Sequence, residues 1–136
     1  MPDLTRRSFG VPGLGHGDNP VPVAARVGGL IATGGIRGVN RETGQMPEDV
    51  AGQARLMVAN LIAAVEAAGG SADTILKVTI HLKSAETRSE INPAWVECFP
   101  DPDRRPSRQV LIYADLAGKV RVQCDALAVA LKETTA

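Results

Sequence analysis

The side chain with the clearest chemical potential in this sequence is Arg108, which follows a proline-rich loop and opens the apolar segment 107–112. A guanidinium is always charged in proteins, and its planar fork binds a carboxylate through two parallel hydrogen bonds. An arginine at the start of a predicted strand therefore indicates a receptor for a small carboxylate. The alternative is a structural ion pair with Asp101, Asp103 or Asp125, and we favour the ligand.

Three other polar side chains are candidates for contact with a ligand. The amide of Gln123 cannot take up a proton at neutral pH, but its carbonyl can orient a water molecule, and inert packing is an equal alternative. Asp125 follows on the same strand face and can supply a carboxylate, although a salt bridge with Arg121 or Arg108 is the favoured interpretation. Asn92 can cap a helix or contact the ligand.

Glycines and histidines complete the set of candidates. Gly34 and Gly35 leave room for the close approach of a ligand or a neighbouring subunit. His81 has no partner motif and is interpreted as a packed or solvent-facing residue, whereas His16 lies in a Gly-rich segment and could close over a pocket. The sequence has no nucleotide-binding loop and no set of metal ligands, so no cofactor and no metal are expected.

Hydrophobic periodicity predicts the elements that must position these residues. Residues 23–27 and 30–34 form two short strands across a Gly-Gly turn, and the 3.6-residue stripe over 49–68 indicates a helix that a second Gly-Gly pair ends. Alternation over 76–82 predicts a strand with Leu76 on its core face.

A second helix is expected over 86–99. Pro93 either bends this helix, which we favour, or follows Asn92 as the cap of a shorter one. Two closing strands are expected at 108–114 and 120–131, joined by a turn at Ala117-Gly118.

The predicted order β-β-α-β-α-β-β is that of an α+β domain with one mixed sheet and two helices on one face. The expected organisation is a Gly/Pro-rich arm at 1–20, a single domain at 21–132 and a tail at 133–136. The other sheet face mixes polar residues with Leu127, Val129 and Leu131. This mixture predicts a face that contacts other subunits and keeps polar groups for a ligand.

Composition limits the classes of partner. The 136 residues are 44% hydrophobic and 22% charged, and fifteen basic residues cancel fifteen acidic ones, so no global field attracts nucleic acid or an anionic membrane. Four aromatic residues make a base-stacking platform improbable. The N-terminus lacks a signal-peptide core and no apolar run approaches membrane-spanning length, which predicts a cytoplasmic protein. Cys98 and Cys124 lack metal-ligand spacing and fall inside predicted regular elements, so both are expected to be buried free thiols.

Short motifs over residues 20–131 occur in an order and at spacings that match those of a known protein family. The motifs are Val27-Gly28-Gly29-Leu30-Ile31-Ala32-Thr33-Gly34-Gly35, Thr43-Gly44, Gln53-Ala54-Arg55, Asn60-Leu61, Ala67-Ala68-Gly69, Val78-Thr79, Asn92, Phe99-Pro100, Pro106-Ser107-Arg108 and Val122-Gln123-Cys124-Asp125-Ala126-Leu127-Ala128. In these residues the chain resembles the Rid family, also called YjgF/YER057c/UK114. The resemblance implies a chorismate-mutase-like fold, a homotrimer with three inter-subunit clefts, and cofactor-free hydrolysis of reactive imines and enamines to keto acids and ammonia.

The resemblance also assigns roles residue by residue. Arg108 matches the family arginine that binds the substrate carboxylate, and Asn92 matches a pocket asparagine. Four positions depart from the best-known deaminases: Val21 replaces a tyrosine, Gly34 a serine, Val110 a cysteine and Gln123 a glutamate associated with water activation. The implied site has Arg108 and Gln123 as catalytic residues, with Asn92, Gly34, Gly35, Val110 and Val21 beside the substrate.

Three functions are compatible with these residues. The first is a hydrolase for 2-imino or 2-enamino acids, in which Arg108 binds the carboxylate. The second is a non-catalytic trimer that binds small carboxylates, because the four replacements remove polar groups from the pocket. The third and weakest is an endoribonuclease, against which the balanced charge and the lack of a His or Lys pair count.

Overall fold

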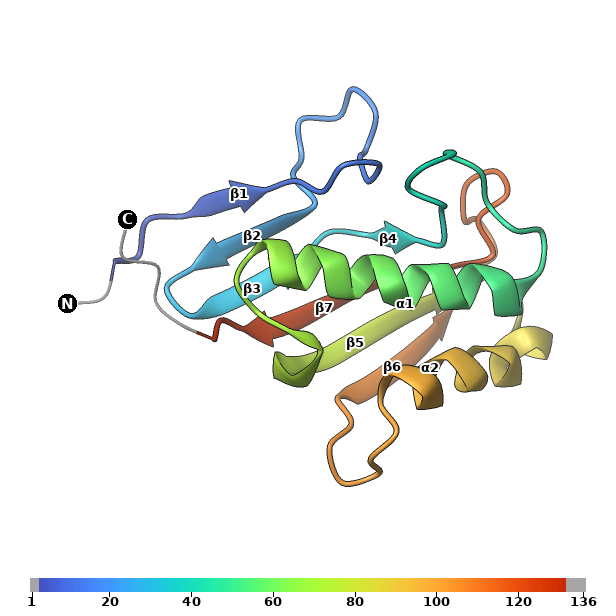
Figure 1. Ribbon diagram of the computed structural model, residues 1–136. Helices are drawn as coiled ribbons and strands as arrows, with labels where there is room; N and C mark the ends of the chain where they lie inside the picture. The colour runs from blue at the N-terminus through green and yellow to red at the C-terminus, as the bar shows by residue number, and fades with distance from the viewer. Residues whose placement is uncertain (1–2, 132–136) are drawn as a thin grey trace.

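A seven-stranded sheet backed by two helices dominates the computed structural model, which describes residues 3–131 (Figure 1). The strands follow the order β1-β2-β3-β7-β5-β6, and β4 pairs with β7. The β5–β6 pair is parallel and the other pairs are antiparallel, so the predicted mixed sheet is confirmed. The strands are β1 (Arg7–Phe9), β2 (Ala24–Val27), β3 (Leu30–Thr33), β4 (Ile36–Arg37), β5 (Ile75–Leu82), β6 (Ser107–Ile112) and β7 (Val122–Val129).

The long helix α1 (Val50–Ala67) lies across the sheet, as predicted. Asp49 caps its first turn by accepting a hydrogen bond from the Gly52 amide at 3.0 Å, and the left-handed backbone of Gly69 (φ 100°) follows its end. By length and composition α1 could cross a membrane, which corrects the expectation that no apolar run is long enough. Half of this 18-residue helix is buried inside the domain, as is usual for the core helix of a soluble protein.

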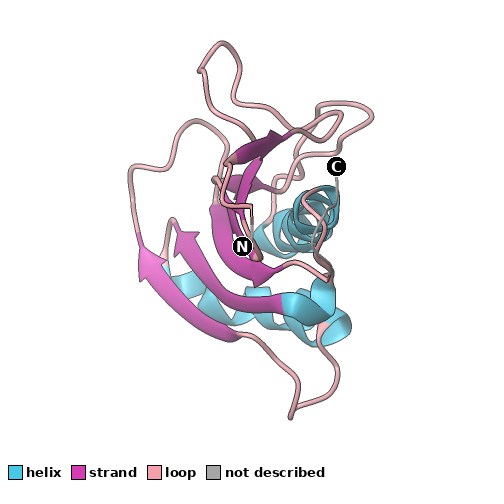
Figure 2. Cartoon of the chain, turned by 90° about the vertical axis from the view of Figure 1, so that its left-hand side faces the viewer, coloured by secondary structure: helices cyan, strands magenta, loops and turns pink. Residues whose placement is uncertain are grey.

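The core lies between this helical layer and one face of the sheet. Val78, Ile80 and Leu82 of β5 point into it, beside the even-numbered residues of β7 from 122 to 128. Trp95 and Phe99 pack edge to face with ring centroids 4.8 Å apart. Figure 2 shows the twisted sheet curving past one side of α1, which is seen almost end-on.

The second helical segment differs from the prediction. A 3₁₀ helix, η2 (Ala85–Ile91), leads directly into the short α-helix α2 (Asn92–Cys98), which has Pro93 in its first turn. Proline is compatible with a first helical turn because its missing N–H would have no partner there, so the proline begins α2 instead of bending a longer helix.

Other differences have local causes. Residues 7–9, in the predicted irregular arm, form β1 and extend the sheet beside β2. Leu76 is 61% exposed because a register shift between Ile75 and Lys77 turns Ile75 inward in its place. Cys98 is half-buried and Cys124 is buried, and both thiols are free.

The two closing strands end earlier than expected. The Ala117-Gly118 turn is present, with the Val120 amide donating to the Ala117 carbonyl at 3.1 Å, but β5 separates β6 from β7 in the sheet. A further 3₁₀ turn, η1 (Ala72–Thr74), precedes β5. The predicted tail at 133–136 lies outside the described residues.

Candidate functional site

Arg108 is the second residue of β6, the strand at one edge of the sheet. It pairs with Val78, so its side chain projects on the helix-covered side of the sheet. One terminal nitrogen, Nη2, donates to the Asn92 side-chain oxygen at 3.0 Å, and the guanidinium carbon lies 5.0 Å from the centre of the Trp95 ring. The arginine is thus held by a stacking contact and one hydrogen bond.

The other terminal nitrogen of Arg108, Nη1, is buried and has no hydrogen-bond partner. The ion pairs present between described residues are Arg55–Glu97 and Arg104–Asp101, so the predicted alternative of an ion pair to Arg108 is not found among residues 3–131. Burial lowers the pKa of the Arg108 guanidinium, but an arginine stays protonated in proteins. The arrangement therefore offers a charged donor that lacks an acceptor.

Asn92 does not cap the helix that it begins. Its own backbone is helical (φ −61°, ψ −38°), and the N-cap position belongs to Ile91, which makes no side-chain cap. The Asn92 carboxamide orients Arg108 instead. Val110 lies two residues along β6 on the same side as Arg108 and is half-buried. We call Asn92, Trp95, Arg108 and Val110 the arginine group.

Gly34 and Gly35 connect β3 to β4, which both pair with β7. Ala32 pairs with Leu127, and Ile36 pairs with Cys124. The segment with the glycines thus advances four residues while β7 advances three, so the glycines occupy a β-bulge with one extra residue. A Cβ on Gly35 would lie 3.5 Å from the Gln123 amide nitrogen. A Cβ on Gly34 would lie 3.4 Å from Nε2 of His16. We call His16, Gly34, Gly35 and Gln123 the glycine group.

The sheet separates these two groups within one chain. Gln123 pairs with His81 and projects on the face that the helices leave open, whereas Arg108 projects on the opposite face. Val21 is 55% exposed and precedes β2, which lies four places from β6 in the strand order. The structure thus joins Arg108 with Asn92, and Gln123 with Gly35, but no single chain brings all the predicted residues together.

Two further polar residues share the open face with Gln123. His81 is half-buried, and its Nδ1 atom is buried without a hydrogen-bond partner. Asp125 pairs with Thr79 and is half-buried. Within residues 3–131 Asp125 forms neither of the predicted salt bridges with Arg121 or Arg108.

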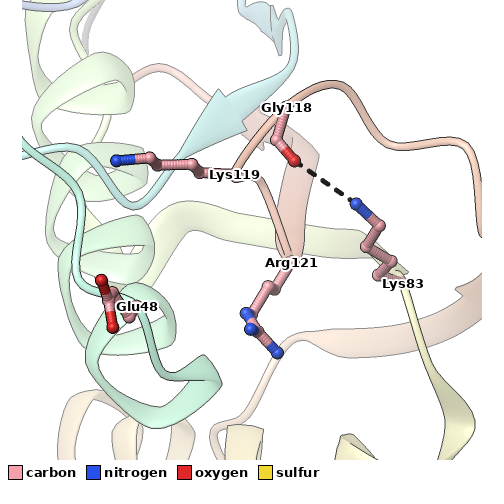
Figure 3. Close-up of a pocket in the computed structure, with 5 residues that line it drawn as sticks. All are labelled: Glu48, Lys83, Gly118, Lys119 and Arg121. Atoms are coloured by element: carbon pink, nitrogen blue, oxygen red, sulfur yellow. Dashed lines mark hydrogen bonds between the residues drawn. The ribbon is translucent and has the colours of Figure 1, made fainter.

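Two features were missed by the sequence analysis. Trp95 supports Arg108, and the signal for this was its spacing of three residues from Asn92, which places both on one helical face. The second is a cavity of about 530 Å³ lined by Glu48, Lys83, Gly118, Lys119 and Arg121 (Figure 3). Lys83 and Glu48 are far in the sequence from the segment 118–121 that completes the lining, so spacing gives no signal for this cavity. None of the predicted site residues lines it. No group of His, Cys, Asp and Glu among residues 3–131 has the arrangement of a metal site.

Known proteins resemble this chain over most of its length. A family model described as Endoribonuclease L-PSP matches residues 19–130. The 2-iminobutanoate/2-iminopropanoate deaminase of Escherichia coli (strain K12) is 35% identical over 104 residues, which cover 76% of this chain and 81% of that protein.

Solved structures agree with the family match. The YjgF gene product from E. coli superposes with a TM-score of 0.82 at 30% identity, covering 90% of this chain and 98% of that chain. E. coli TdcF with bound serine gives a TM-score of 0.82 at 28% identity, with coverage of 90% and 98%.

Proposed function

Because the chain belongs to the Rid (YjgF) family, which the Endoribonuclease L-PSP model describes, we propose that it hydrolyses reactive 2-imino and 2-enamino acids to 2-oxo acids and ammonia. The observation that carries this proposal is the buried, unpartnered Nη1 of Arg108 beside a second nitrogen held by Asn92. A buried donor without an acceptor is costly, and a substrate carboxylate supplies the acceptor.

The relatives support the same ligand class. One is named a 2-iminobutanoate/2-iminopropanoate deaminase, and TdcF has been crystallised with serine, an amino acid. Both names describe small molecules with a carboxylate next to a carbon that bears nitrogen. An arginine fork fits the carboxylate, and the rest of the site must bind the nitrogen-bearing carbon.

We place the complete site between two copies of the chain in a homotrimer. The arginine group of one copy would face the glycine group of the next, because these groups lie on opposite faces of one sheet. Exposed Leu30, Leu127 and Val129 on the open face supply apolar surface for the contact.

The residues named so far chiefly position the substrate. Water adds to the carbon of the C=N bond, which is already electrophilic, and ammonia then leaves. Arg108 fixes the carboxylate, Gly34, Gly35 and Val110 surround the imino end, and the Gln123 carbonyl orients the attacking water. No cofactor takes part, and a cytoplasmic location remains the sequence-based prediction.

A second candidate is a carboxylate-binding trimer without catalytic activity. Val21, Gly34, Val110 and Gln123 favour it, since none of them exchanges a proton at neutral pH. An endoribonuclease is the weaker alternative, because fifteen basic and fifteen acidic residues leave no net charge to attract RNA.

The test is a coupled assay that generates imines of different amino acids and follows 2-oxo acid and ammonia release. The wild type should accelerate imine decay over buffer. Arg108→Ala should lose about 2 to 5 kcal/mol of transition-state stabilisation while keeping its fold. Arg108→Lys should retain only part of this stabilisation, because lysine lacks the two-pronged geometry of the guanidinium. If only the binder is correct, 2-oxo acids will raise the melting temperature of the wild type through Arg108 without any acceleration. Full activity in Arg108→Ala would contradict the role of Arg108.

A further inference from the structure

The imidazole of His16 lies next to the position that a side chain on Gly34 would take. Its Nε2 atom lies 3.4 Å from the position that a Cβ on Gly34 would take. His16 is half-buried and lines a small cavity together with Gly35 and Arg37. The imidazole therefore reaches the glycine bulge from a segment that lies far from it in the sequence.

The loop that carries His16 is tied to the rest of the domain. Nη2 of Arg37 donates to the carbonyl of Gly15 at 3.4 Å, and the Asn19 amide donates to the carbonyl of His16 at 3.2 Å. The Leu14 amide donates to the Val11 carbonyl at 3.0 Å. The bond from Arg37 joins the loop to β4, and the other two bonds shape the loop itself, so the imidazole is positioned at the bulge.

The other groups around the bulge are poorly suited to move protons. The Gly34 amide donates to the Val23 carbonyl at 2.9 Å, and its own carbonyl accepts from the Thr33 hydroxyl at 2.9 Å. Gln123 carries an amide, and Arg37 stays protonated. Of the carboxylates, Asp18 lies in the same loop as His16, and Asp125 lies on the open face of the sheet. Of the described groups at the bulge, only an imidazole is suited to both accept and donate a proton near neutral pH.

We propose that His16 is the proton-transfer residue of the imine-hydrolysing site, a role that rests on the function proposed above. In the addition step, Nε2 takes a proton from the attacking water as the new C–O bond forms, and the C=N electron pair moves to nitrogen. The imidazolium returns the proton to that nitrogen, giving a carbinolamine. In the second step Nε2 takes the hydroxyl proton, the C–N bond breaks, and the nitrogen leaves as ammonia with the returned proton. Water and the 2-imino acid thus give a 2-oxo acid and ammonia with no other reactant.

The sequence offers a clean test because it contains only two histidines. His16→Ala should lower kcat/KM for imine decay by about 10²- to 10⁴-fold, the range for a placed acid or base. The acid limb of the wild-type pH–rate profile, corrected for buffer, should be absent from His16→Ala. Added imidazole should restore part of the rate to His16→Ala. The rise in melting temperature with a 2-oxo acid should persist, because Arg108 is unchanged.

Two further variants separate His16 from its rivals. Gly34→Val should reproduce the loss, since its side chain excludes the imidazole, and melting curves will check that it folds. His81→Gln should keep both the rate and the pH limb. The proposal is overturned if His16→Ala retains the wild-type rate. It is also overturned if the acid limb of the pH–rate profile persists in His16→Ala but is lost in His81→Gln or Asp125→Asn. A wild type that does not accelerate imine decay overturns both this proposal and the proposed function, whereas activity independent of His16 overturns this proposal alone.

Discussion

Arg108 and Gln123 present two different chemical problems within the proposed site. Arg108 is a charged donor whose burial leaves one nitrogen without an acceptor, so it is suited to bind a carboxylate. Gln123 lies beside Gly35 and can orient water, but its amide cannot change protonation. Arg108 thus provides for binding of the substrate carboxylate, and residue 123 is a position at which a substitution would add a second group for proton transfer.

Gln123→Glu tests that step directly. A carboxylate at this position should raise the rate for substrates whose hydrolysis needs proton transfer, by no more than the roughly 10²- to 10⁴-fold attributed to a placed acid or base. Imine decay should be measured for the wild type and the variant with several amino-acid-derived imines, with Asp125→Glu as a control that lengthens a carboxylate already on the same face. An equal or lower rate with every imine would show that proton transfer at residue 123 does not limit the reaction.

At the scale of elements, the buried side chain of Gln53 joins α1 to the loop that leads into β7. Its Nε2 donates to the carbonyls of Pro47 at 2.7 Å and Lys119 at 3.0 Å, and its Oε1 accepts from the Arg121 amide at 2.9 Å. One side chain thus satisfies three backbone groups where the strand that carries Gln123 begins.

Replacing Gln53 by leucine should therefore cost stability without changing the volume of the core greatly. Each buried backbone group left without a partner costs about 1 to 3 kcal/mol, so Gln53→Leu should lower the free energy of unfolding by at least about 2 kcal/mol. Urea titration of the variant and the wild type gives the difference. The matched control is Gln45→Leu, because Gln45 is exposed and its change should stay within about 0.5 kcal/mol. Equal effects of the two variants would contradict the role of Gln53.

Elements with strong periodicity could be predicted from the sequence, and the features that depend on pairing could not. Periodicity predicted α1 and the β2–β3 hairpin because each depends on local spacing. The bulge that exposes Leu76 depends on the register of β5 against β7, which no local pattern reports. The same limit applies to the site: alternation placed Gln123 and Asp125 on one face, but only the parallel register of β6 against β5 placed Arg108 on the other.

For the whole molecule, this separation of faces determines how a complete site can form. The arginine group and the glycine group cannot face one ligand in a single chain, because the sheet lies between them. Apolar residues, including Leu30 at 55% and Val129 at 48% exposure, lie on the face that the described residues leave uncovered. Contact between copies of the chain would cover this surface and bring the two groups together. Light scattering should therefore give the mass of a trimer, and a monomer at all concentrations would contradict the shared site.

Complementation between two inactive variants tests whether each site is shared. Arg108→Ala damages the arginine group, and Gly35→Val places a side chain beside Gln123, where a Cβ lies at ordinary contact distance of 3.5 Å. Each variant alone should be inactive in the imine assay. In a mixed trimer, one interface in three combines an intact arginine group from one copy with an intact glycine group from another, so random mixing should restore about a quarter of the wild-type activity. Arg108→Ala mixed with Asn92→Ala should recover far less, because both changes fall in the arginine group. If mass spectrometry shows mixed trimers of Arg108→Ala and Gly35→Val but the assay shows no recovery, the two groups do not meet across a subunit interface.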